Sequence, residues 1–181
     1  MNYQNLSLAF KRINTELPLL PYLQEICDGI AVGQTDKKEV DKILIGCGVH
    51  RSVATVDFLH LIFAYIKIAL EDEMLTQEEK DNIRFLKTLF HIQPGDFYYH
   101  NKLDVEKTIM DQLSKIYADD FITEEEAELK SAIQEVFDLT YDQMNEYAKM
   151  KAAVSIIKGA DPKDLDIVFT YEEYFKLRAA R

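Results

Sequence analysis

The stretch LEDEMLTQEE, residues 70–79, reads as a helix end, an acidic turn and the start of a second helix. Thr76 stands three residues before Glu79, the spacing of a capping box. In that motif the threonine hydroxyl accepts a backbone N–H of the first turn, and the glutamate reaches back to the N–H of the cap. Apolar residues then recur at three- and four-residue spacings, which is typical of a helix with one buried face: Ile83, Leu86, Leu89 and Phe90. The stretch therefore predicts two helices joined by a short acidic connection.

The same pattern returns 47 residues later as ADDFITEEE, residues 118–126. Thr123 and Glu126 have the capping-box spacing. The apolar stripe that follows consists of Leu129, Ile133, Val136 and Phe137. We expect two related helical hairpins, each covering the apolar stripe that the other cannot bury alone.

Helical periodicity extends along most of the chain, and no stretch shows sustained two-residue alternation. Further helix starts are predicted by two more capping boxes and by an aspartate before a proline: Thr140 with Gln143, Thr170 with Glu173, and Asp161 before Pro162. A helix is also expected to begin near Asp36, after the loop AVGQT. The predicted fold class is all-α, a compact bundle of about eight or nine helices built on two related helical-hairpin repeats offset by 47 residues.

The expected organisation has three parts. Residues 1–51 form an N-terminal helical extension packed on the core, residues 52–158 form the core with its two repeats, and residues 159–181 form a C-terminal helical tail. The longest apolar stretch, residues 53–70, is interrupted by Asp57, His60 and Lys67, which are costly in a bilayer. We interpret it as a central helix that neighbours cover on every side, and we expect no membrane span.

Charge is concentrated in two places. Residues 71–81 carry six acidic residues and one lysine, and residues 119–128 carry six acidic residues and no basic one. These two segments therefore account for the whole net charge of −11. Such a charge argues against nucleic acid or anionic lipid as a partner, because both are negatively charged and bind basic surfaces more tightly. A cation or a basic protein partner fits better.

The clustered carboxylates predict a divalent-cation site of the calcium or magnesium class, which takes oxygen ligands. The candidate ligands end one helix or begin the next in each segment: Asp72, Glu79, Asp119 and Glu126. An ordinary EF-hand is excluded by spacing, since loops starting at Asp72 and Asp119 would place Met74 and Phe121 at a ligand position. The alternative explanation is that acidic residues in the first turn interact favourably with the positive end of the helix dipole. Each such residue stabilises the helix by about 0.3 to 1 kcal/mol.

The two acidic segments resemble the helix elbow of the tellurite-resistance TerB-like domains, whose pattern runs Ala-Asp-Gly-x-Ile-[Ser/Thr]-x-x-Glu-Glu. The matching residues are Asp72, Leu75, Thr76 and Glu79 in one copy and Asp119, Ile122, Thr123 and Glu126 in the other. The resemblance covers roughly residues 52–158. It implies an all-helical fold of two related halves, no established enzyme activity, a link to stress or defence, and divalent-metal binding at the elbows. The family's glycine is Glu73 or Asp120 here, so we expect the tight turn to be made differently.

Signatures of catalysis are missing from the sequence. No histidine pair has the i, i+4 spacing of a helical zinc site, and there is no G-x-S-x-G elbow or glycine-rich phosphate loop. The N-terminus lacks a secretory signal, and Cys27 and Cys47 have no metal or disulfide framework spacing, so we expect a cytoplasmic protein with reduced thiols. The functional hypothesis is a non-catalytic TerB-like binding protein that uses its acidic elbows for a cation, a partner protein or both. The alternative is a metal-independent adaptor or immunity module, and an enzyme is the least favoured class.

Overall fold

The computed structural model describes residues 3–180, with side chains from residue 6 onward. Within that range it is all-helical, with ten helices and no strand, so the prediction of an all-α fold is confirmed, whereas the arrangement in two repeats stays a prediction. This is more than the expected eight or nine helices, and one of the ten is a helix of only five residues, α6 (Asp96–His100). The chain divides into two compact units, Met1–Asp96 and Phe97–Arg181.

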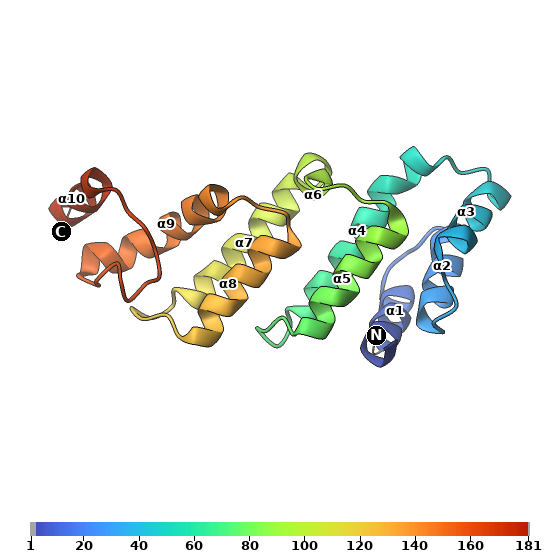
Figure 1. The fold of residues 1–181 in the computed structure, drawn as a ribbon, viewed down its shortest axis with the longest axis horizontal. Coiled ribbons are helices and arrows are strands. Elements are labelled where there is room, and N and C mark those ends of the chain that lie inside the picture. Colours follow the sequence, from blue (N-terminus) through green and yellow to red (C-terminus); the bar gives the residue numbers. More distant parts are fainter. Residues whose placement is uncertain (1–2, 181) are drawn as a thin grey trace. The chain divides into compact units, whose positions relative to one another are not determined.

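The first unit contains five helices: α1 (Tyr3–Glu16), α2 (Pro21–Ala31), α3 (Lys37–Gly46), α4 (Arg51–Ala69) and α5 (Gln77–Phe90). Helices α1 and α2 pack side by side, and α4 and α5 form a hairpin whose connection is acidic (Figure 1). Pro21 occupies the first turn of α2, where its missing N–H costs no hydrogen bond. Asp36 caps α3 by accepting the N–H of Glu39 at 2.9 Å, as the sequence predicted for that helix start.

The core of the first unit centres on α4. Phe58 on α4 stacks on Phe90 of α5 with ring centroids 4.3 Å apart, and both side chains are buried. The prediction that neighbours cover α4 on every side is wrong, because Val53 is 65% exposed and Lys67 reaches solvent. Among the described residues α4 is the one helix long and apolar enough to cross a membrane, and half of its apolar window is buried inside the structure. Core helices of soluble proteins share these properties.

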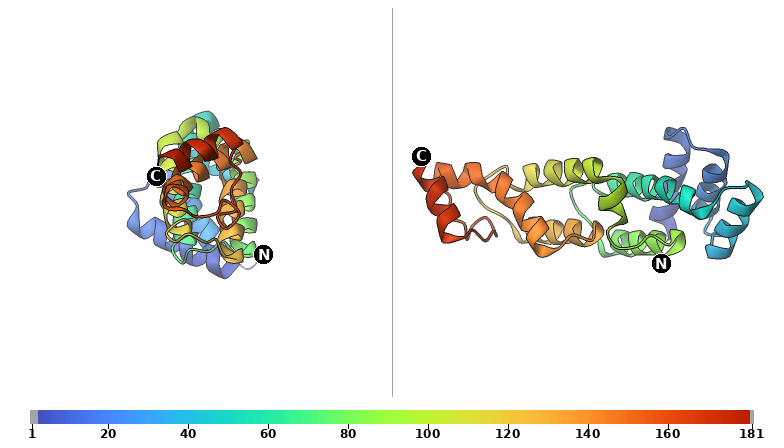
Figure 2. Two further views of the ribbon diagram at one scale, coloured as in Figure 1. Left: turned by 90° about the vertical axis from the view of Figure 1, so that its left-hand side faces the viewer. Right: turned by 90° about the horizontal axis from the view of Figure 1, so that it is seen from above.

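The second unit contains most of α6 and four further helices: α7 (Lys102–Ile116), α8 (Glu124–Val136), α9 (Tyr141–Lys158) and α10 (Tyr171–Ala179). Its core includes the edge-to-face contact of Phe97 with Phe137, whose ring centroids lie 5.9 Å apart. Helix α7 packs on both α8 and α9, and α10 packs on α9 (Figure 2). No residue of α10 is buried, so this last helix contributes little to the core.

All four predicted threonine capping boxes are present, and they begin α5, α8, α9 and α10. The prediction that a helix begins at Asp161 and Pro162 is wrong. Residues 162–166 form turns instead, closed by hydrogen bonds from Asp164 N–H to Asp161 O and from Leu165 N–H to Pro162 O. The boundary between the two units, at residues 96 and 97, lies inside the predicted core of residues 52–158, and the predicted three-part organisation stays a prediction.

Candidate functional site: two acidic elbows

The first acidic elbow, residues 71–81, connects α4 to α5. Glu79 Oε2 accepts the backbone N–H of Thr76 at 2.9 Å and the Thr76 hydroxyl at 2.7 Å. The Thr76 hydroxyl oxygen in turn accepts the N–H of Glu79 at 3.3 Å. Glu79 is only 7% exposed, and its carboxylate caps the N-terminus of its own helix.

The turn before this cap is held by a second carboxylate. Asp72 Oδ1 accepts the N–H of Met74 at 3.2 Å, a local bond that favours a turn. Glu73 between them has a φ of 63°, the left-handed conformation that glycine adopts most readily. Asp120, at the matching position of the second elbow, has no positive φ, so the two elbows differ at this position. The expectation that the turn differs from that of TerB-like domains stays a prediction.

The second acidic elbow, residues 119–128, connects α7 to α8 and repeats the same local contacts. Glu126 Oε2 accepts both the N–H and the hydroxyl of Thr123 at 2.9 Å, and Thr123 Oγ1 accepts the N–H of Glu126 at 3.2 Å. Asp119 Oδ1 accepts the N–H of Phe121 at 3.1 Å. Each of the four predicted metal ligands is thus engaged with its own backbone.

The first elbow is partly neutralised by basic residues of its own unit. Arg12 on α1 donates to Glu71 across 2.7 Å, and this hydrogen bond lowers the pKa of Glu71. Arg84 on α5 lies 2.5 Å from Asp81. The sequence does not indicate this role of Arg12, because no local pattern relates Arg12 to a residue 59 positions away.

The remaining acids of the second elbow face solvent. All four are exposed, and their carboxylates make no hydrogen bond or ion pair within the described part of the chain: Asp120, Glu124, Glu125 and Glu128. Repulsion among them is relieved by water and ions alone, so they raise the negative potential at this surface. The two elbows therefore share a backbone geometry and differ in the charge that they expose.

One carboxylate oxygen of the first elbow has no partner. Glu78 Oε1 is buried without a hydrogen bond, and the charges of Glu78 and Glu79 act on the phenol of Tyr65. Burial, with a smaller contribution from these charges, raises the pKa of Tyr65 to about 12, and its oxygen accepts the side-chain N–H of Asn82 at 3.0 Å. This group of polar atoms lies beneath the first turn of α5.

The predicted four-residue metal site stays a prediction. Among residues 3–180, no three histidine, cysteine, aspartate or glutamate side chains gather closely enough to hold a metal ion. The two elbows belong to different units, so each can be assessed only by itself. Within each elbow, the aspartate and the capping glutamate accept separate local hydrogen bonds.

The second elbow has one further contact that the sequence did not indicate. The N–H of Ile122 donates to the carbonyl of Asp164 at 2.8 Å, which joins the elbow to the segment after α9. That segment also receives Lys130 of α8, which donates to Asp166, and Asn145 of α9. The elbow is thus braced on one side and open to solvent on the other.

No family model, curated protein or solved structure matches this chain. The resemblance of the elbows to TerB-like domains therefore stays a prediction.

Proposed function

We propose that the protein acts by binding rather than by catalysis, and that its second elbow docks a basic surface of a partner protein. The observation that carries this proposal is the set of four exposed carboxylates of that elbow, which have no partner among the described residues. Opposite charges on two surfaces speed their encounter and exclude partners of the wrong sign. The capping glutamate, Glu126, stabilises the elbow and leaves the other acids available.

The first elbow is the weaker candidate for this role. Arg12 and Arg84 already neutralise Glu71 and Asp81, and Glu79 is buried. A basic partner would have to displace these arginines before it gained the same contacts. The proposal therefore assigns docking to the second elbow and a mainly structural role to the first.

A matched pair of triple variants tests this assignment. One variant carries Asp120→Asn, Glu124→Gln and Glu125→Gln, and the control removes three exposed acids elsewhere: Glu25→Gln, Asp104→Asn and Asp111→Asn. The probe is a fluorescently labelled lysine- and arginine-rich peptide, and its dissociation constant is measured over a range of salt concentrations. We expect about tenfold weaker binding for the elbow variant, since exposed pairs contribute about 0.2 to 1 kcal/mol each. Equal losses in both variants would contradict a docking role for this elbow.

A divalent cation at the first elbow is a second candidate function. Its support is the buried, unpartnered Glu78 Oε1 beside Glu79, because a cation would satisfy an oxygen that nothing else in the described residues contacts. The test is a thermal melt of chelator-stripped protein with Ca²⁺, Mg²⁺, Mn²⁺ or Zn²⁺ at fixed ionic strength. Saturation at 100 times the dissociation constant would add about 2.7 kcal/mol, or roughly 5 to 10 °C.

Glutamine substitutions separate the metal role from the capping role in both elbows. Gln143 completes the capping box of α9, so glutamine can serve at this position in the present chain. Glu78→Gln and Glu79→Gln should each remove an ion-dependent shift at the first elbow with little change in the melt without metal. Glu126→Gln makes the same comparison for the second elbow. The absence of any shift at millimolar ion would contradict the cation proposal.

We also infer an internal duplication, which the recurrence of helix bounds supports. Helix α4 ends at Ala69 and α7 at Ile116, and α5 begins at Gln77 and α8 at Glu124. Each pair is 47 residues apart, as are the paired hydrogen bonds of the elbows. We also propose TerB-like membership, a role in stress or defence, and a cytoplasmic location. The metal-independent adaptor or immunity type is the version that the exposed second elbow favours.

A further inference from the structure

The segment that follows α9, residues 160–170, crosses the second unit as a strap with a two-residue alternation. Leu165 and Ile167 are buried, whereas Asp164, Asp166 and Val168 are exposed. The carbonyls of these three exposed residues are the ones that accept hydrogen bonds from the rest of the unit. One side of the strap therefore faces the protein with its apolar side chains, and alternate carbonyls are held by donors.

The donors come from three separate elements. Ile122 N–H of the second elbow donates to Asp164 O at 2.8 Å, Lys130 Nζ of α8 donates to Asp166 O at 2.5 Å, and Asn145 Nδ2 of α9 donates to Val168 O at 3.2 Å. Lys130 also forms an ion pair with the Asp166 carboxylate. We call this surface, with its donors on residues 122, 130, 145 and 149, the strap groove.

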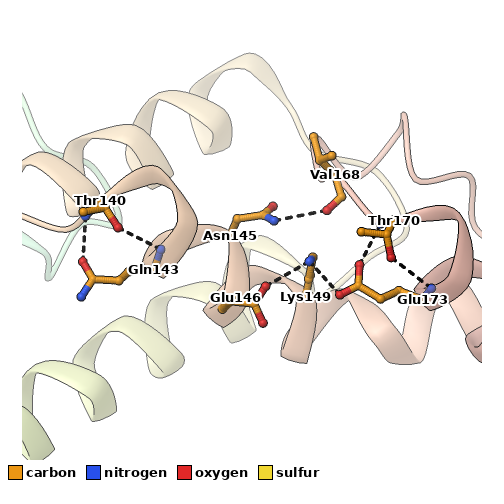
Figure 3. Close-up of polar contacts among 8 residues, drawn as sticks. All are labelled: Thr140, Gln143, Asn145, Glu146, Lys149, Val168, Thr170 and Glu173. Carbon is orange, nitrogen blue, oxygen red and sulfur yellow. Dashed lines mark hydrogen bonds and ion pairs between the residues drawn. The ribbon is translucent and has the colours of Figure 1, made fainter.

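Beyond the strap, a lysine of α9 joins that helix to α10. Lys149 Nζ, on α9, lies 2.9 Å from Glu173 Oε1 and 3.0 Å from Glu146 Oε1, as Figure 3 shows together with the Asn145 contact. The side chains of Lys130 and Lys149 are both only 15% exposed. In a chain of net charge −11, the groove thus presents two lysines and two N–H donors to a segment that contributes acceptors.

Two hollows border the strap and α10. One of about 320 Å³ is open to solvent along α9 and α10 and is lined by Met150, Ala153, Phe169 and Leu177 among others. The other, of about 220 Å³, lies where the strap passes α8 and α9. Because α10 has no buried residue, the buried apolar side chains that oppose departure of the whole segment are Leu165 and Ile167 of the strap, and segments with few buried apolar contacts open more readily than the core.

The connection to α9 can act as a hinge. Gly159, the residue after α9, has a φ of 118°, a conformation that residues with a side chain rarely adopt. Pro162 is only partly buried, and Asp161 and Lys163 are exposed. Straightening at Gly159 would carry the strap and α10 away from their own groove without disturbing α7, α8 or α9.

We propose that the strap and α10 exchange between two copies of this chain, so that each groove holds the segment of the other copy. The strap is the one peptide whose acceptors are already matched to the donors of the groove, so exchange restores every intramolecular contact across copies. Exchange of an identical element is a low-cost route to a symmetric dimer. Two ion pairs make the groove specific for this segment: Lys130 with Asp166 of the strap, and Lys149 with Glu173 of α10.

A charge reversal tests the exchange on the full chain. Lys130→Asp in one sample and Asp166→Lys in another each place like charges between groove and strap. When the two are mixed, opposite charges meet in both grooves only if the straps are exchanged. We expect a 1:1 dimer of about 42 kDa in the mixture by light scattering, twice the 21.0 kDa chain mass. The double variant, with both reversals in one chain, restores opposite charges between groove and strap. By light scattering it should show the same dimer-to-monomer ratio as the unmodified protein.

Two further experiments test the exchange if the first pair of variants folds poorly. Lys149→Glu mixed with Glu173→Lys should produce the same dimer through α10. Gly159→Ala destabilises the monomer in which the strap lies in its own groove, because alanine disfavours the positive φ of residue 159. This substitution should raise the dimer-to-monomer ratio by roughly tenfold. Mixtures that remain monomeric at high concentration would overturn the exchange. Monomeric mixtures whose Asp166→Lys chain binds a synthetic peptide of residues 160–180 would also overturn it, and would assign the groove to a partner's peptide.

Discussion

Lys149 on α9 is joined to Glu173 on α10 by an ion pair of 2.9 Å, and Glu173 is also the residue that closes the capping box of α10. The same carboxylate thus starts the last helix and fastens it to the preceding one. Hydrogen bonding from Thr170, followed by that from Lys149, lowers the pKa of Glu173 from 4.5 to about 2. This coupling makes the attachment of α10 sensitive to acid.

Acid should release α10 through Glu173. A carboxylate whose pKa is lowered by folding stabilises the folded state above its ordinary pKa, here 4.5, and that stabilisation is lost as the pH falls towards 2. Backbone chemical shifts of residues 171–179 should therefore change between pH 4.5 and pH 2. In Glu173→Gln, which can still cap the helix, the shifts should change clearly less over this range. Identical titration of both proteins would show that another group controls the helix.

Removal of a cap in the second elbow should destabilise the protein measurably. Thr123→Ala eliminates the hydroxyl that accepts the Glu126 N–H, at a typical cost of about 1 kcal/mol, or roughly 2 to 4 °C in melting temperature. Thr88→Ala is the matched control, since Thr88 is exposed within α5 and caps no helix. A calorimetric melt that shows the same change for both substitutions would contradict the capping role.

The stacked pair in the first unit should be sensitive to truncation. Phe90→Ala removes a buried ring that stacks on Phe58 and leaves a cavity, with an expected cost of about 3 to 5 kcal/mol. Phe90→Leu should cost clearly less, because it retains most of the buried volume. Urea unfolding monitored in the first unit measures both. A loss below about 1 kcal/mol for alanine would mean that the aromatic pair is not central to that unit.

The two cysteines should differ sharply in reactivity. Cys27 is buried, and burial together with the charge of Asp28 raises the pKa of its thiol to about 12, whereas Cys47 is exposed. The thiolate is the reactive form, so a thiol reagent at pH 8 should modify Cys47 rapidly and Cys27 only after denaturation. One rapid equivalent is expected for the native protein and none for Cys47→Ser. Two rapid equivalents in the native protein would contradict the burial of Cys27.

Local signals account for most of what the sequence predicted correctly. A capping box needs only two residues three positions apart, so the sequence alone predicts the starts of α5, α8, α9 and α10. The elbow contacts of Asp72 and Asp119 are equally local. Such patterns report backbone geometry, and they say little about which carboxylates remain exposed.

Long-range contacts explain what the sequence could not predict. Arg12 meets Glu71 across 59 residues, and Lys130 meets Asp166 across 36. The false helix start at Pro162 has the same origin, because the downstream residues are drawn onto α8 and α9 as a strap. Nothing in the stretch from residue 161 to residue 166 reveals that contact.

The most direct test of the proposed function locates the basic probe on the full chain. In a ¹H–¹⁵N NMR titration with the lysine- and arginine-rich peptide, the largest amide shifts should fall within residues 118–128. The Asp120→Asn, Glu124→Gln and Glu125→Gln variant should lose those shifts, and the control triple variant should keep them. Shifts centred on the first elbow, or unchanged in the elbow variant, would contradict the assignment of docking to the second elbow.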